Sequence, residues 1–194
     1  WTTIINNYAW TVAFKPDNAN IVYTTVENGS SSTFYKSIDA GASFTPKTTG
    51  WYVPASGENI YGVRITVTHP PATIIYALIG GDGDNLNGYV GVWKSTDAGE
   101  TWTHPHGVVG KPYVFSTHPN LMAHNGTDGF YQGFYDFAII VSPNDANKLI
   151  IGGTSWWQSS DGAVSYQPLG GYVGSLPWSH PDMQFLAAQG NDLW

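Results

Sequence analysis

Residues 94–103 read KSTDAGETWT and bring together side chains that could do chemistry. Two acids, Asp97 and Glu100, and two hydroxyls, Ser95 and Thr101, lie close together beside a tryptophan. Carboxylates next to hydroxyl groups are common general acids, bases and nucleophiles in active sites. The same residue types also close tight turns, because their oxygens accept hydrogen bonds from backbone N–H groups. The segment is therefore either part of an active site or a polar turn.

This segment is one of three similar segments, which we call the polar turns. They read KSIDAGASF at 36–44, KSTDAGETW at 94–102 and QSSDGAVSY at 158–166. In each, a serine precedes an aspartate by two positions, and a hydroxyl residue and an aromatic residue follow it by four and five. A carboxylate at the tip of a hairpin is occupied by backbone donors, so we expect a structural role here. The residues with this expected role are Ser37, Asp39, Gly41, Phe44, Ser95, Asp97, Gly99, Trp102, Ser159, Asp161 and Tyr166.

The polar turns resemble the Asp-box (bacterial neuraminidase) repeat, Ser/Thr-x-Asp-x-Gly-x-Thr-Trp. The first copy ends in Phe44 rather than Trp. In the third copy Gly162 directly follows the aspartate and Ala163 occupies the usual glycine position, which leaves that turn open to a different conformation. The resemblance implies a sialidase-like β-propeller, similar to sortilin-type receptors and xyloglucan-cleaving endoglucanases. It also implies that the Asp-boxes are folding elements at the outer rim, away from any active site.

The remaining sequence predicts an all-β protein. Short runs rich in Val, Ile, Thr and Tyr alternate with Gly, Pro, Asn and Asp, which is typical of strands and turns. No segment of a dozen residues shows a helical period with caps, so we expect almost no helix. The expected strands are 10–16, 20–27, 32–37, 63–70, 73–81, 89–95, 137–143 and 148–154.

The order of strands and turns repeats. Asp39, Asp97 and Asp161 mark equivalent points of a unit of about 60 residues with four short strands. Such a unit suits a propeller blade, because a four-stranded sheet has two faces to bury and radial packing covers both. We expect a partial propeller over 1–194, with three complete blades at about 8–50, 60–106 and 134–170 and partial blades at 1–6 and 180–194. Since propellers usually close with about four to eight blades, we also expect a segment of a longer protein.

The composition excludes several classes of protein. The formal net charge is −7 and Arg64 is the single arginine, which argues against nucleic-acid binding. The sequence has no cysteine, so disulfides, cysteine-ligated metals and thiol catalysis are excluded. No run approaches the roughly 18–20 apolar residues that a membrane span needs.

In a propeller, the loops that lead into the innermost strands open on one face near the central channel. These loops here are rich in polar and aromatic side chains, which suit a carbohydrate because its rings stack on aromatics and its hydroxyls need hydrogen-bond partners. The expected ligand-binding residues are Trp10, Tyr61, Arg64, Tyr135, Trp178 and His180. Asp136 and Asp182, in comparable loops one blade apart, are the candidate acid and base of a glycoside hydrolase. The alternative is that these aromatics pack between blades and these acids only cap loops.

Metal and cofactor sites are not expected. In the loop 81–88, Asp82, Asp84 and Asn87 resemble calcium ligands, but the distal glutamate and the spacing of a calcium loop are missing. A flexible polar loop is the preferred interpretation. The histidines show no zinc-binding spacing.

The resemblance points to three functions. Sialidases clamp their substrate with three arginines, so the resemblance disfavours this activity in a chain whose only arginine is Arg64. The preferred hypothesis is a secreted or cell-surface bacterial propeller without enzymatic activity of its own, acting as a binding or assembly platform for protein or polysaccharide. The alternative is a glycoside hydrolase of the xyloglucanase kind, completed by further blades of the same or a partner chain.

Overall fold

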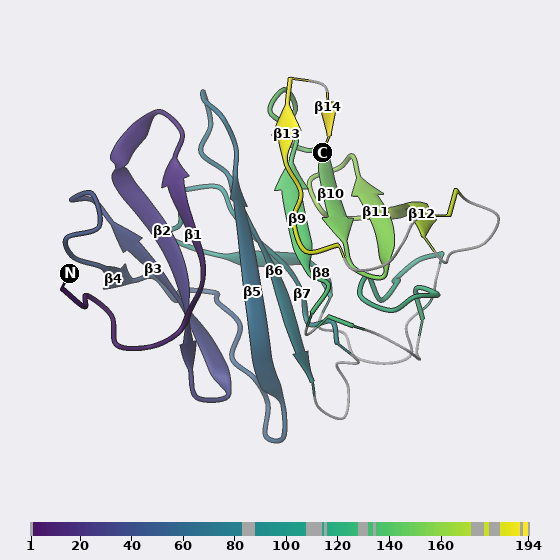
Figure 1. Cartoon of the computed structure of the whole chain (residues 1–194), viewed down its shortest axis with the longest axis horizontal. Coiled ribbons are helices and arrows are strands. Elements are labelled where there is room, and N and C mark those ends of the chain that lie inside the picture. The colour runs from purple at the N-terminus through teal and green to yellow at the C-terminus, as the bar shows by residue number, and fades with distance from the viewer. Residues whose placement is uncertain are drawn as a thin grey trace.

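A computed structural model describes residues 2–82, 88–107, 114, 116–127, 132–133, 135–171, 177–178, 183–190 and 192–193. These residues form strands and turns and contain no helix, which confirms the predicted all-β class (Figure 1). Accordingly, none of them belongs to a helix long and apolar enough to cross a membrane.

The strands form three antiparallel sheets of four strands and one short hairpin. The first sheet contains β1 (Ala9–Lys15), β2 (Asn18–Asn28), β3 (Ser31–Ser37) and β4 (Thr45–Pro46). The second contains β5 (Asn59–Val67), β6 (Ile75–Asp82), β7 (Gly91–Ser95) and β8 (Thr103–Gly107). The third contains β9 (Ala138–Val141), β10 (Leu149–Gly152), β11 (Ser155–Ser159) and β12 (Gln167–Gly171), and β13 (Ala188–Gln189) pairs with β14 (Asp192–Leu193). Within each four-stranded sheet the strands pair in chain order, as in a propeller blade.

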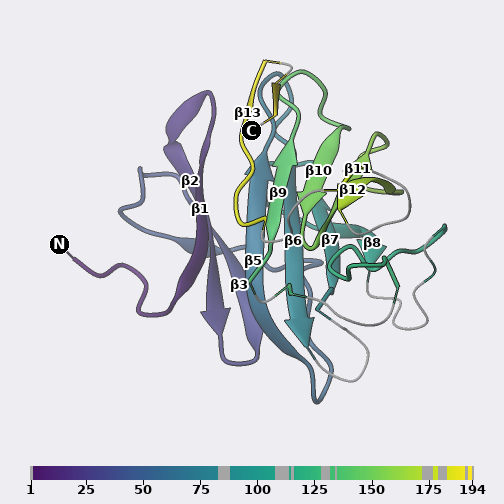
Figure 2. The same ribbon diagram turned by 45° about the vertical axis from the view of Figure 1, so that its right-hand side comes forward.

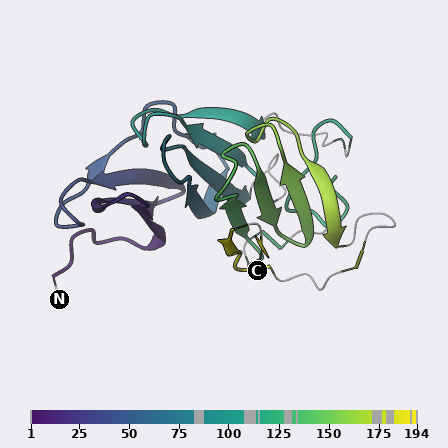
Figure 3. The ribbon, with the colours of Figure 1, turned by 90° about the horizontal axis from the view of Figure 1, so that it is seen from above.

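The three sheets lie side by side in an arc, which Figure 3 shows from above. Their first strands, β1, β5 and β9, are neighbours along the inner side of this arc (Figures 1 and 2). The N–H of Ile60, at the start of β5, donates to the carbonyl of Ser30 in the β2–β3 hairpin, 2.8 Å away. The beginnings of the inner strands and these hairpins therefore share one end of the sheets, the start face. The polar turns follow the third strands and occupy the opposite end, the turn face.

Aromatic side chains fill the junction between the first and second blades. Phe34 and Trp51 both contact Trp102, with ring centroids 4.7 Å apart in each pair and ring planes inclined by 69° and 74°. All three side chains are buried, together with Val63 and Ile75 of the second blade. Edge-to-face pairing adds to the roughly 2–3 kcal/mol that burial of such a side chain contributes.

Aliphatic side chains dominate the junction between the second and third blades. Tyr76 and Leu78 of β6 pack in one buried cluster with Ile139 of β9, Leu149 of β10 and Trp157 of β11. The second blade is therefore covered on both faces. This explains why β6 is apolar on both of its sides rather than alternating, since each side faces a neighbouring sheet.

The first blade differs from the other blades in two ways. Residues 2–6, where we expect part of a preceding blade, pair with none of the described residues. Phe44 is only half-buried, whereas Trp102 and Tyr166, at the same position of the other polar turns, are buried. The reason is that Trp102 and Tyr166 contact the blade before their own, and the described residues place no sheet on that side of the first blade.

A matched pair of glycine substitutions tests the blade junction. Gly41 and Gly99 both adopt left-handed backbone conformations, with φ of +90° and +86°. A Cβ on Gly99 would lie 2.8 Å from the Phe34 ring, whereas a Cβ on Gly41 meets nothing closer than 3.9 Å. We expect Gly41→Ala to lower the free energy of unfolding by about 1 kcal/mol from backbone strain, and Gly99→Ala by about 2–4 kcal/mol because overpacking adds to it. Urea denaturation measures the free energy of unfolding of both variants. Equal decreases would show that the polar turn is not packed tightly against the neighbouring blade.

Candidate functional site

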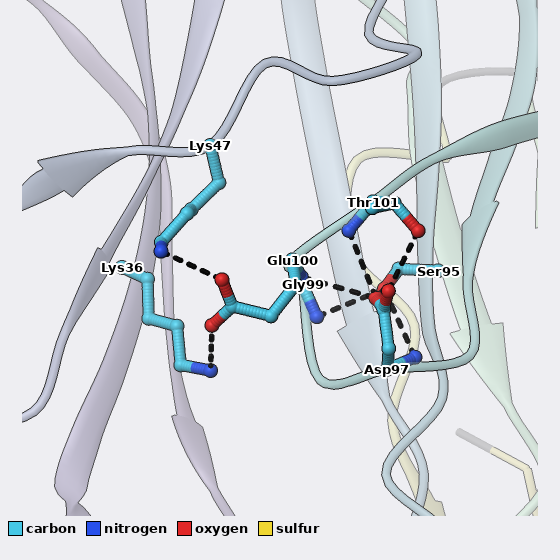
Figure 4. A network of polar contacts seen from close by, with 7 residues as sticks. All are labelled: Lys36, Lys47, Ser95, Asp97, Gly99, Glu100 and Thr101. Atoms are coloured by element: carbon cyan, nitrogen blue, oxygen red, sulfur yellow. Dashed lines mark hydrogen bonds and ion pairs between the residues drawn. The ribbon is translucent and has the colours of Figure 1, made fainter.

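In the second polar turn, both carboxylate oxygens of Asp97 accept hydrogen bonds from residues of the same turn (Figure 4). The Ser95 hydroxyl donates to Asp97 Oδ1 over 2.7 Å, and the Thr101 N–H donates to the same oxygen over 2.9 Å. The Thr101 hydroxyl donates to Asp97 Oδ2 over 2.6 Å. The Gly99 N–H in turn donates to the Ser95 hydroxyl oxygen over 2.8 Å, so the hydroxyl bridges carboxylate and backbone.

The other two polar turns have the same geometry. Hydroxyls from Ser43 and Ser165 donate to the carboxylates of Asp39 and Asp161 over 2.5 Å in both turns. The third turn is thus not different, although its sequence left that open. Ala163 adopts φ of +76° at the position that glycine occupies elsewhere, and its N–H donates to the Ser159 hydroxyl over 3.0 Å. The other two turns also contain an alanine with positive φ, Ala40 and Ala98, one position earlier, where the third turn has Gly162.

Hydrogen bonding keeps the three turn aspartates ionised. The hydroxyl of Ser43 is the main cause that lowers the pKa of Asp39 to about 2. Partial burial raises the pKa of Asp97 and Asp161, but hydrogen bonds from Thr101 and Ser165 outweigh it and lower both values to about 2. A carboxylate that is ionised and already bonded at both oxygens is a poor general acid or nucleophile at neutral pH. The turn face therefore has a structural role.

Glu100, the second acid of the opening segment, also serves the fold. Its two carboxylate oxygens accept ion pairs from Lys36 at 2.8 Å and Lys47 at 2.6 Å, which reach across from the first blade (Figure 4). Hydrogen bonds from Lys36 and then Lys47 lower the pKa of Glu100. Because Glu100 is exposed to solvent, each ion pair is worth only about 0–1 kcal/mol, and together they link the first two blades.

Midway along β5, Arg64 contacts β1 of the first blade and the residue before β9 of the third blade. Its Nη1 donates to the backbone carbonyl of Trp10 on β1, 2.7 Å away. Its guanidinium carbon lies 5.8 Å from the centre of the Phe137 ring, which directly precedes β9. A Cβ on Gly80 would lie 3.1 Å from Phe137 and 3.3 Å from Tyr61. Of the expected ligand-binding residues, the structure thus joins Arg64 to the Trp10 backbone. It places Tyr61 beside Gly80, as it does Phe137, which Arg64 contacts.

The other candidate residues have different surroundings. Tyr135 and Trp178 are 56% and 67% exposed. Asp136 is fully buried, and its N–H donates to the Gln132 carbonyl over 2.7 Å. A carboxylate without exposed surface does not face a cleft, so the geometry does not favour Asp136 as a catalytic acid. His180 and Asp182 lie outside the described residues.

A pocket of about 500 Å³ opens where the first blade begins. Its lining consists of Ile5, Asn6, Asn7, Tyr8, Glu27 and Gly29. The Asn7 amide donates to the Glu27 carbonyl over 3.0 Å, and the Glu27 N–H donates to the Tyr8 carbonyl over 2.8 Å, so the segment before β1 is tied to the end of β2. Tyr8 is 79% exposed. Sequence reasoning missed Asn7 and Glu27, because only the β1–β2 register places the end of β2 beside the start of β1.

A buried histidine lies where the loop before the third blade meets the second blade. His106 Nδ1 and the Tyr89 hydroxyl are hydrogen-bonded at 2.7 Å, and the His106 ring lies 5.1 Å from that of His118 and 4.9 Å from that of Tyr166. Its Nε2 has no hydrogen-bond partner among the described residues. Burial, followed by the nearby His118, lowers the pKa of His106 to about 4. His106 is therefore neutral at pH 7.

The structure gives no support for a metal centre in the part of the chain that it describes. Within that part, no three His, Cys, Asp or Glu side chains are grouped so that they could hold a metal ion. Asp82 is exposed, while Asp84 and Asn87 lie outside the described residues.

Comparisons with known proteins agree with the fold. A GH74 enzyme from Niastella koreensis is similar over 87% of this chain, with 17% identity and a TM-score of 0.50. The GH74 xyloglucanase from Xanthomonas campestris is similar over 83%, with 20% identity and a TM-score of 0.50, and an ancestral GH74 enzyme over 86%, with 13% identity and a TM-score of 0.54. The chain spans 24%, 21% and 19% of these enzymes, respectively. No protein-family model and no curated protein matches the sequence. The chain is thus built of β-propeller blades.

Because His106 is buried and neutral, we expect the protein to lose stability in acid. The pKa of His106 is about 4 in the folded protein and 6.5 in the unfolded chain. Its contribution to the free energy of unfolding is therefore complete above pH 6.5 and is lost as the pH falls toward 4. We expect this to remove up to about 3 kcal/mol from the free energy of unfolding. Urea denaturation between pH 7.5 and 4.5 should therefore show a steeper decline for the parent than for His106→Gln, which cannot titrate. Parallel profiles would contradict the neutral, buried state.

Proposed function

We propose that this chain is part of an Asp-box β-propeller that binds a polysaccharide across its start face. We also propose that it acts outside the cytoplasm of a bacterium, where such polymers are met. The observation that supports the proposal best is the pocket at the start of β1, which combines an exposed aromatic ring with amide and carboxylate groups.

The chemistry of that pocket suits a sugar. The exposed ring of Tyr8 offers a surface on which an apolar sugar face can stack. The side chains of Asn6, Asn7 and Glu27 line the same pocket and can exchange hydrogen bonds with hydroxyl groups. A polymer fits better than a single small sugar, because Tyr135 and Trp178 present two further exposed aromatic rings on the third blade side of the arc.

Among the described residues, the acids of the polar turns are already engaged within the fold. The aspartates of the turn face are bonded to their own hydroxyls and backbone, and Glu100 is paired with two lysines. A ligand there would have to replace these partners, which costs their hydrogen bonds. The start face is therefore the better place for recognition.

A glycoside hydrolase is the second candidate function. The observation that favours it is the likeness of this chain to part of three GH74 enzymes, one of them a xyloglucanase. The burial of Asp136 speaks against it, since an acid and base pair must face the same cleft. The test is whether the protein releases reducing ends from xyloglucan. Release by the parent that is lost in both Asp136→Asn and Asp182→Asn would establish glycoside hydrolase activity. We expect binding without such release.

Substitution of Tyr8 tests the proposed function. We expect Tyr8→Ala to weaken the affinity for the bound polysaccharide by about three- to tenfold, because the stacking surface is lost. Affinity gel electrophoresis with xyloglucan, mixed-linkage β-glucan and polygalacturonate measures the retardation of each variant.

Ile38→Ala is the matched control. Ile38 is 74% exposed and lies in the first polar turn, at the opposite end of the same sheet, so its loss should leave the affinity unchanged. Equal retardation of the parent and Tyr8→Ala, or an effect of Ile38→Ala alone, would contradict a binding site on the start face. If no polysaccharide retards the parent, the proposed function fails.

A further inference from the structure

Arg64 has an environment that a purely structural arginine does not require. It is the only arginine of a chain that carries fourteen acids, yet it forms no ion pair with any acid of the described residues. It is half-buried, and this burial alone lowers the pKa of its guanidinium. A partly desolvated cation without a carboxylate partner loses hydration that nothing on the described chain replaces in full.

Within the described part of the chain, the neighbours that hold the guanidinium leave most of its N–H groups without a partner. One of its five N–H groups donates to the Trp10 carbonyl, and the Phe137 ring lies against it. These contacts come from β1 and from the start of β9, on either side of β5, so the group lies where the three inner strands meet. Its position is thus fixed before any ligand arrives, which lowers the entropy lost on binding.

Three acids on segments that adjoin β5 or Phe137 are otherwise placed. Glu58 accepts hydrogen bonds from the Tyr52 hydroxyl at 2.5 Å and from the Ala55 N–H at 2.8 Å, and so closes its own loop. Asp82 is exposed at the end of β6, and Asp136 is fully buried before β9. None of these carboxylates forms an ion pair with Arg64.

We propose that Arg64 is the anchor of a carboxylate-binding subsite on the inner side of the arc, and that the polysaccharide bound here contains uronic acid residues. This deepens the proposed function and rests on it. A planar guanidinium with free N–H groups matches a planar carboxylate, which it binds through two parallel hydrogen bonds. The Trp10 carbonyl and the Phe137 ring hold the guanidinium on two sides.

The charge of the whole chain makes this subsite selective. With a net charge of −7, the protein repels a polyanion unless a local cation offsets the repulsion. Binding of an acidic polysaccharide should therefore depend on Arg64 rather than on a general basic surface. The affinity for a neutral polysaccharide should not depend on Arg64.

The experiment compares polygalacturonate with highly methyl-esterified polygalacturonate, which has the same backbone without the negative charges. Isothermal titration of the 194-residue chain measures both affinities for the parent, Arg64→Gln and Lys148→Gln. Lys148 is exposed at the turn before β10, so its substitution removes the same charge away from the subsite. We expect the parent to bind polygalacturonate more tightly than the ester, Arg64→Gln to lose about tenfold for polygalacturonate only, and Lys148→Gln to match the parent.

The outcomes separate this inference from the proposed function. If the parent binds the ester as tightly as the acid, or Arg64→Gln binds polygalacturonate like the parent, the inference is overturned while polysaccharide binding stands. If the parent binds neither of these polymers nor any neutral polysaccharide, the proposed function itself fails. Should Arg64→Gln not fold, Arg64→Lys keeps the charge but loses the planar fork. It should then lose severalfold in affinity for polygalacturonate, and an unchanged affinity would overturn the inference.

Discussion

Everything in this structure depends on the need of each four-stranded sheet to cover two faces. A single blade cannot do so, and the second blade succeeds because the first and third lie against it. Phe34, Trp51 and Trp102 meet this need on one side, and they do so because Gly99 lets the polar turn approach the Phe34 ring closely. Packing between blades, rather than strand propensity, thus determines where each turn and loop lies.

This constraint separates the two ends of the molecule. On the turn face, every acid of the polar turns is bound by its own hairpin, and Glu100 joins neighbouring blades through two lysines. On the start face, the loops lead to inner strands that the blades hold rigidly, while side chains such as Tyr8 remain exposed. Recognition by loops on a rigid scaffold is a common arrangement. Here it places Arg64 among three strands from three different blades.

Much of the fold could be predicted from the sequence, because alternating apolar runs and the repeated polar turns report local structure. The third turn was harder, since the left-handed conformation of Ala163 is imposed by hydrogen bonds that its sequence does not reveal. The site was predicted only in part. Trp10 and Arg64 were named as separate residues, but the hydrogen bond between them depends on how the first two blades pack. The burial of Asp136 and the pairing of Asn7 with Glu27 depend on tertiary contacts in the same way.

The central claim is that the turn face builds the blades and the start face binds the ligand. Amide chemical shifts of the isotope-labelled chain, titrated with an oligosaccharide of the polymer that binds best, test it most directly. The account predicts shifts at Asn7, Tyr8, Glu27 and Arg64, with the amides of Gly41 and Gly99 unchanged. Shifts that concentrate at the polar turns and leave the segment before β1 unaffected would contradict it.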